Sequence, residues 1–107
     1  MKAIVAYVQP FMLEKVADAL RAQTINGVSV IQCQGFGCRV EGQSPHYEDP
    51  SVEMGYAPKV KIEIVCRDEQ VSAIVKAIRE GAHTGRHGDG KIFISDIMQA
   101  FDIRTGV

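Results

Sequence analysis

Glycine and lysine gather in one short stretch, AHTGRHGDGKIFIS, at residues 82–95. Gly85, Gly88 and Gly90 fall within six residues, and Lys91 follows directly. Backbone N–H groups of such turns can surround phosphate oxygens, and a lysine adds a positive charge. The GxxxxGK[ST] spacing of a Walker A loop is absent, and an apolar run follows. The stretch predicts either a phosphate-binding loop or a plain turn between a helix and a strand.

Two cationic residues flank a long polar segment. Arg39 follows the Gly35-Phe36-Gly37 turn, and Lys59 follows the segment. At the base of a hairpin these side chains would face each other and could hold a small anion, because guanidinium offers paired donors to a planar oxyanion. The alternative is that Lys59 is a solvated strand end.

Metal and nucleophile patterns are weak. The three histidines and three cysteines are scattered along the chain: His46, His83, His87, Cys33, Cys38 and Cys66. The histidines share no helical face, and an odd number of cysteines without a CxxC pair argues against a zinc site or a disulfide framework. We expect no metal site, and we expect Cys33 and Cys66 to be small buried apolar residues. No Ser-His-Asp or Cys-His arrangement can be inferred from the spacing.

Strand and helix periodicities alternate around these groups. Strands are predicted at residues 3–8, 28–36, 60–66 and 92–97, and helices with one buried stripe at 11–22 and 71–78. Asp68 is placed to cap the start of the second helix. The order β-α-β-β-α-β predicts an α+β ferredoxin-like fold, an antiparallel sheet with two helices on one face.

The segment at about residues 38–57 has neither periodicity. It is polar, with several prolines and acids, and loops this long in compact domains tend to be functional or disordered. Met54 and Tyr56 are apolar groups on this polar loop, and they predict either a partner-binding tip or simple loop packing.

Composition limits the class of protein. With 107 residues, 46% hydrophobic and 23% charged, the chain is predicted to be one globular domain, residues 1–107. A net charge of −1 gives no overall attraction to nucleic acid or anionic lipid. No apolar stretch is long enough to cross a bilayer, so we expect a cytoplasmic protein without membrane insertion.

Four ordered blocks resemble the PII signal-transduction family. They are GFG at 35–37, PKVKIEIV at 58–65, TGRHGDGKIFI at 84–94 and IRTG at 103–106, and the match runs from Met1 to Thr105. The resemblance implies a homotrimer that binds ATP, ADP or AMP in clefts between subunits. It also implies that the long segment is the family's T-loop, which docks on a target protein.

The resemblance further implies a set of site residues. Those expected to bind nucleotide are Ser29, Gly35, Gly37, Cys38, Glu63, Val65, Gly88, Asp89, Gly90, Lys91 and Arg104, the last reaching the phosphates from the neighbouring chain. Lys59 matches the lysine that meets 2-oxoglutarate. Arg39 and Lys59 are the expected anion-binding pair.

Departures from the family pattern affect the ligands. Cys38-Arg39 stands where the family usually has Arg-Gln, so the glutamine that helps hold magnesium and 2-oxoglutarate is missing. Asp102 replaces a second phosphate arginine, which should weaken triphosphate binding relative to ADP or AMP. These changes favour a divergent member linked to bicarbonate and carbon fixation. The alternative is a conventional nitrogen-status regulator that senses ATP, ADP and 2-oxoglutarate.

Two other classes fit less well. A phosphate-transferring or nucleotide-hydrolysing enzyme would use the glycine loop and Lys91, but no catalytic base is evident. An RNA-binding ferredoxin-like module would need exposed aromatic residues on its central strands, and KVKIEIV at 59–65 has none. We therefore expect a regulatory binding protein, not an enzyme, without a catalytic cofactor.

Overall fold

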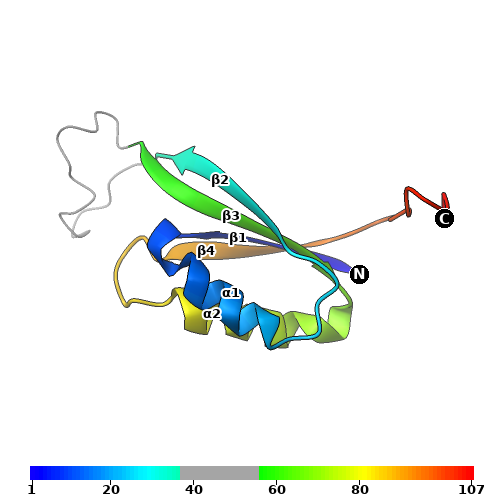
Figure 1. The fold of residues 1–107 in the computed structure, drawn as a ribbon, viewed down its shortest axis with the longest axis horizontal. Helices are drawn as coiled ribbons and strands as arrows, with labels where there is room; N and C mark the ends of the chain where they lie inside the picture. Colours follow the sequence, from blue (N-terminus) through cyan, green and yellow to red (C-terminus); the bar gives the residue numbers. More distant parts are fainter. Residues whose placement is uncertain (37–55) are drawn as a thin grey trace.

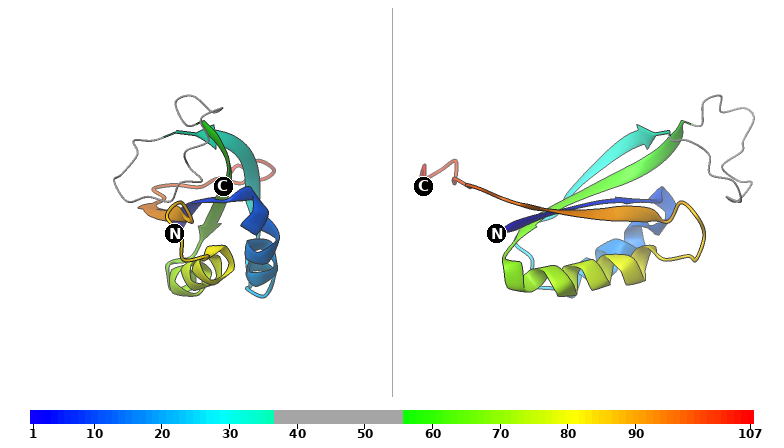
Figure 2. Two further views of the ribbon diagram at one scale, coloured as in Figure 1. Left: turned by 90° about the vertical axis from the view of Figure 1, so that its left-hand side faces the viewer. Right: turned by 180° about the vertical axis from the view of Figure 1, so that it is seen from behind.

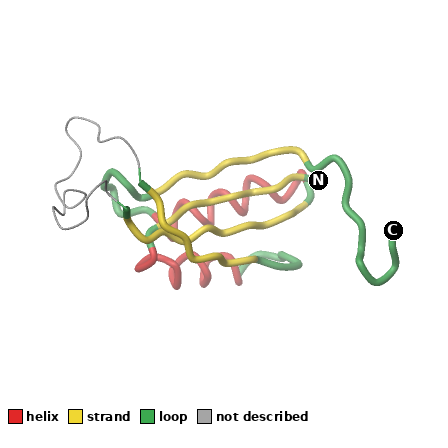
Figure 3. Tube along the Cα trace, turned by 90° about the horizontal axis from the view of Figure 1, so that it is seen from above, coloured by secondary structure: helices red, strands yellow, loops and turns green. Residues whose placement is uncertain are grey.

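The computed structural model describes residues 1–36 and 56–107. It contains one four-stranded antiparallel sheet, and both helices lie on the same side of this sheet (Figures 1 and 3). The elements are β1 (Lys2–Val8), a 3-10 turn (Pro10–Met12), α1 (Leu13–Arg21), β2 (Ser29–Gly35), β3 (Ala57–Cys66), a second 3-10 turn (Asp68–Gln70), α2 (Val71–Ala82) and β4 (Gly90–Asp96). The predicted ferredoxin-like βαββαβ fold is confirmed.

The strands lie in the order β2-β3-β1-β4. Ile4 of β1 is opposite Ile64 of β3 and Ile94 of β4. Because successive side chains on a strand point to opposite faces, this register assigns every residue of the sheet to one of two faces. We call them the helix-facing side and the open face.

The core lies between the sheet and the helices. Its members are apolar: Ile4, Ala6, Val8, Val16, Leu20, Val60, Ile62, Ile64, Cys66, Ile74, Ala77, Ile78 and Ala82. They come from alternate positions on β1 and β3 and from one stripe on each helix. The predicted periodicities thus correspond to the buried faces.

The two helices approach each other closely at Gly81. A Cβ atom there would lie 2.8 Å from Val16 Cα and 3.0 Å from the Lys15 carbonyl oxygen. No larger side chain fits without moving the α1 backbone. Gly81 therefore permits the spacing of the helix layer.

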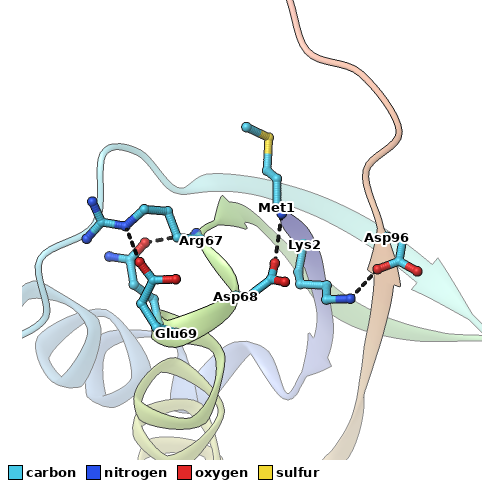
Figure 4. Close-up of polar contacts among 7 residues, drawn as sticks. Met1, Lys2, Arg67, Asp68, Glu69 and Asp96 are labelled. Atoms are coloured by element: carbon cyan, nitrogen blue, oxygen red, sulfur yellow. Dashed lines mark hydrogen bonds and ion pairs between the residues drawn. The ribbon is translucent and has the colours of Figure 1, made fainter.

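The end of the sheet that carries the N-terminus is tied by ion pairs (Figure 4). The Met1 amino group lies 2.7 Å from the Asp68 carboxylate, Lys2 contacts Asp96, and Arg67 Nε lies 3.0 Å from Glu69. The prediction that Asp68 caps α2 is wrong, because its carboxylate accepts a hydrogen bond from the amino terminus instead. This bond to the terminal ammonium group lowers the pKa of the Asp68 carboxyl group.

Several predicted boundaries move by a few residues. The first helix region begins with the 3-10 turn, whose first position is Pro10, and α1 starts only at Leu13. The third strand begins at Ala57, so the end of the predicted 38–57 loop belongs to β3.

Cys33 is half-buried, not buried as expected, since it lies on the open face of an edge strand. No helix in the described ranges is long and apolar enough to span a membrane.

The rest of the predicted T-loop lies outside the described residues. Its base is described on both sides: Phe36 follows β2 and Tyr56 precedes β3. The two rings pack edge to face with centroids 4.8 Å apart. This aromatic pair lies directly beyond Gly35 and Ala57, the last paired residues of β2 and β3.

Candidate functional site

The glycine-rich segment joins α2 to β4 at the end of the sheet opposite the chain termini (Figures 1 and 2). Gly90 has φ +122°, and a Cβ atom there would lie 1.8 Å from the Tyr7 carbonyl oxygen. Gly90 is therefore required by the packing of β4 against β1, whatever the loop binds. This packing role agrees with the plain-turn alternative, and the phosphate-binding alternative stays a prediction.

Asp89 holds the loop in shape. Its carboxylate accepts hydrogen bonds from the Thr84 N–H at 2.7 Å, from the Gly85 N–H at 2.9 Å and from the Thr84 hydroxyl. The N–H groups of Thr84 and Gly85 form a small anion-binding concavity, and the chain's own Asp89 occupies it. Asp89 thus acts within the loop.

The same hydrogen bonds control the charge of Asp89. Burial by itself would raise the pKa of the carboxyl group, but the bonds from Thr84 and Gly85 outweigh burial, with a smaller contribution from His83. The net pKa is lower than the ordinary value of 3.8. A loop fastened by an ionised carboxylate is the form expected at neutral pH.

Lys91 projects from the open face at the start of β4. The register puts it opposite Tyr7 of β1, which in turn is opposite Lys61 of β3. Lys91 Nζ lies 5.8 Å from the ring centroid of Phe93, within reach of a cation–π interaction. This row presents two ammonium groups on either side of a tyrosine, although Lys61 is already paired with Glu63 at 2.8 Å.

Lys59 and Gln9 both contact the carbonyl oxygen of Gly88. Gln9 Nε2 donates to it at 2.7 Å and Lys59 Nζ at 3.4 Å, so the loop is linked to the ends of β1 and β3. Burial lowers the pKa of Lys59 below its ordinary value of 10.5. A half-buried ammonium group of this kind gains from a nearby anion, because the anion replaces hydration that burial removed.

Three predicted nucleotide-contacting residues lie together further along the open face. Ser29 of β2 is directly opposite Glu63 of β3, and Val65 follows two residues later on the same face. Val65 is 51% exposed. A hydroxyl, a carboxylate and an apolar side chain side by side can bind a polar heterocycle by its edge and its face.

The remaining predicted site residues are not gathered here. Gly35 ends β2 near Lys59, whereas Gly37, Cys38 and Arg39 lie outside the described residues. Arg104 is in the tail after β4, and this tail lies at the opposite end of the molecule from the glycine loop (Figure 2). Within one chain Arg104 therefore cannot meet the same phosphate as Lys91.

A small hollow lies between the loop, α2 and the ends of β1 and β4. It measures about 170 Å³, and its lining comes from both strands, α2 and the loop: Tyr7, Val8, Ile78, Arg79, Ala82, His83, Asp89, Gly90, Lys91 and Ile92. Ligand pockets usually measure about 300–1,000 Å³, so this hollow is too small for a nucleotide.

Sequence reasoning missed two residues of this site. Gln9 stands just beyond the predicted first strand, residues 3–8, and Thr84 stands in the block at 84–94 that resembles the PII family. The available signals were a polar side chain directly after a buried strand, for Gln9, and the position five residues before Asp89, for Thr84. Neither signal reveals its partner until the loop is folded.

Among the described residues, no group of three or more His, Cys, Asp or Glu side chains is arranged to hold a metal ion.

The fold and site define a ferredoxin-like domain with a fastened glycine loop and a lysine-bearing open face. Comparison with known proteins gives the family. The model of the family "Nitrogen regulatory protein P-II" matches residues 1–107, and the chain belongs to this PII family.

Curated relatives agree with this assignment over nearly the whole chain. The chain is 42% identical to the nitrogen regulatory protein P-II of Rhizobium meliloti (strain 1021), and 45% identical to those of Bradyrhizobium diazoefficiens and Cereibacter sphaeroides. Each match covers 99% of this chain and 94% of the relative. The predicted family is confirmed.

Proposed function

We propose that this protein is a PII signalling protein that binds adenine nucleotides through its glycine loop and open face. The observation that carries the proposal is the shared location of the predicted contacts. Lys91 and Lys59 lie at the loop end of the open face, and Ser29, Glu63 and Val65 lie further along it. This order suits a ligand with phosphate at one end and a polar ring at the other.

The nucleotide cleft is proposed to be completed by a second subunit of a homotrimer. The open face carries half-exposed apolar side chains, among them Ile31, Val65 and Phe93, and faces of this kind usually mark protein contacts. A neighbouring chain would also supply its Arg104 to the glycine loop, because the tail that carries Arg104 lies far from the loop of the same chain (Figure 2). The predicted trimer and the predicted nucleotide site thus depend on the same surface.

Two effectors are candidates, each favoured by one observation. The relatives are named nitrogen regulatory proteins, which favours a nitrogen-status regulator that senses ATP, ADP and 2-oxoglutarate. Cys38-Arg39 and Asp102 depart from the family pattern, which favours a divergent member that prefers ADP or AMP and binds bicarbonate through Arg39 and Lys59. The half-buried Lys59 ammonium suits either anion.

The proposed role is regulatory and not catalytic. Nucleotide and anion binding would shift the population of T-loop conformers, and only some of these would dock on a target protein in the cytoplasm. The relatives' names describe regulators, which supports this role. No catalytic cofactor is needed for such a mechanism.

Calorimetric titration of ADP, AMP and ATP into the wild-type protein and into Lys91→Ala tests the proposal. Loss of the lysine should weaken binding of the phosphate-bearing ligands about 10- to 100-fold, because charge-assisted hydrogen bonds contribute roughly 1.5–3 kcal/mol. Lys76→Ala, on the exposed side of α2, is the matched control and should bind like the wild type. Equal affinity of Lys91→Ala and wild type would remove the loop from the site.

The same titrations with 2-oxoglutarate or bicarbonate present distinguish the effectors. Tighter ATP binding with 2-oxoglutarate would select the nitrogen regulator and reject the divergent one. Tighter ADP or AMP binding with bicarbonate, lost in Arg39→Ala, would select the divergent member.

A further inference from the structure

Asn26 and Gly27 lie side by side in the segment that connects α1 to β2. Asn26 is the only asparagine of the chain, and asparagine is one of the thermolabile residue types. Both residues are exposed, and they belong to neither a helix nor a strand, because α1 ends at Arg21 and β2 begins at Ser29. Chemistry that needs an asparagine followed by glycine therefore has one place in this chain.

The connecting segment is held before Asn26 but not at the Asn-Gly pair itself. Gln70 Nε2 donates a hydrogen bond to the Thr24 carbonyl oxygen at 2.6 Å, and Ile25 packs against the core. Within the part of the chain that the structure describes, neither the Asn26 side chain nor the Gly27 N–H makes a hydrogen bond. No hydrogen bond has to break before the Asn26 side chain meets the Gly27 nitrogen.

Gly27 also leaves this encounter sterically open. A Cβ atom on the residue after an asparagine hinders the approach of its backbone nitrogen to the side-chain amide, and glycine has none. A Cβ atom at Gly27 would have no other atom within 4 Å, and the φ angle of Gly27 is outside the left-handed region. The fold does not require glycine here, so alanine can replace it without strain.

We propose that Asn26 is a site of spontaneous deamidation in the folded protein. The Gly27 backbone nitrogen attacks Cγ of Asn26 and forms a C–N bond, and the side-chain nitrogen leaves as ammonia with the proton of the Gly27 N–H. Water then opens the resulting succinimide. Attack of water on Cγ gives aspartate, and attack on the main-chain carbonyl carbon gives isoaspartate, in which the main chain runs through the side chain.

Both products change the segment that leads into β2. Each places a negative charge at position 26, and isoaspartate also adds a methylene group to the main chain. Ser29, the first residue of β2, is opposite Glu63 of β3. The modification would therefore alter the backbone next to two predicted nucleotide contacts.

A second pair of related chemistry, Asp89-Gly90, is protected by the fold. An aspartate followed by glycine can form the same succinimide with loss of water, and hydrolysis again gives isoaspartate. The Asp89 carboxylate is held by the N–H groups of Thr84 and Gly85 at 2.7 and 2.9 Å, and Gly90 is paired with Val8 in the sheet. This pair should stay intact while the exposed pair reacts.

Incubation of the wild-type protein at neutral pH and physiological temperature, followed by tryptic digestion and mass spectrometry, tests the proposal. The peptide of residues 22–39 should gain the mass difference between an amide and an acid at Asn26, and enzymatic carboxyl methylation should detect isoaspartate in it. The peptide of residues 87–91 should remain free of isoaspartate. Gly27→Ala should deamidate several-fold more slowly, with an unchanged circular dichroism spectrum.

The same incubation in guanidinium chloride removes the contribution of the fold, and both pairs should then form isoaspartate. Deamidation of Asn26 in the denatured chain but not in the folded protein would reject the proposal, because the connecting segment would then protect the residue. Equal rates for Gly27→Ala and the wild type would also reject it. In that case the Asn-Gly pair would not be the reacting unit.

Discussion

At the scale of single residues, the glycine loop depends on a few specific partners. Asp89 binds Thr84 and Gly85, Gln9 binds Gly88, and Gly90 avoids a collision with Tyr7. Each contact joins positions that the sequence separates or leaves without an evident partner. The loop is thus shaped before any ligand is present, which reduces the conformational entropy lost on binding.

Acidification should weaken the hydrogen bonds that the Asp89 carboxylate accepts from the Thr84 and Gly85 N–H groups. The folded pKa lies below the ordinary value of 3.8, so the carboxylate stabilises the loop above that pH, and the stabilisation is lost as the pH falls through the folded pKa. The Thr84 and Gly85 amide signals in NMR spectra should therefore titrate with a midpoint below 3.8.

Asp89→Asn should abolish that titration, since the amide side chain does not ionise. Asp18→Asn, which removes a carboxylate on the surface of α1 instead, should leave it unchanged. A midpoint at or above the ordinary value would contradict the proposed fastening.

At the scale of elements, the helix layer depends on the contact between α1 and α2. Gly81→Ala places a Cβ atom against the Val16 backbone and should lower the free energy of unfolding by about 1–3 kcal/mol, as overpacking does in other cores. Urea unfolding followed by circular dichroism measures the change. In an open helical position the same substitution would stabilise the helix by roughly 1 kcal/mol. A loss of stability therefore indicates the close approach of the two helices, and a gain would contradict it.

Ser72→Ala provides the control for that measurement. Ser72 is exposed on the same helix, and its replacement should change stability by no more than about 0.5 kcal/mol. A Gly81→Ala protein as stable as the wild type would show that the helices can separate without cost.

At the scale of the whole molecule, the open face should be covered by other subunits. Light scattering after gel filtration should give about three times the chain mass of 11.7 kDa. Phe93→Asp places a charge on the β4 edge of this face, where Phe93 packs edge to face on Tyr7, and should shift the mass toward that of one chain. Loss of the assembly should also abolish nucleotide binding, because the cleft would lose its second wall.

Ala73→Asp introduces the same charge on the exposed side of α2 and should leave the assembly intact. Circular dichroism of both variants verifies that the chain remains folded. A Phe93→Asp protein with the wild-type mass would reject the open face as the subunit interface.

The sequence by itself determined the order of the elements and the family. Alternation on β3 and the i, i+3, i+4, i+7 stripes on both helices follow from strand and helix geometry, so Ile62, Ile64, Val16 and Ile74 were predictable as core positions. The glycine-lysine block was equally visible, because its residues are neighbours in the chain.

Only the tertiary structure decided which distant residues serve that block. Asp68 turned to the amino terminus and not to α2, and Gln9 and Lys59 met on one carbonyl oxygen of Gly88. Such contacts depend on how strand ends and loops approach one another, which local periodicity does not encode. Strand pairing also put Ser29 beside Glu63, because a register is set by packing between strands and not within one.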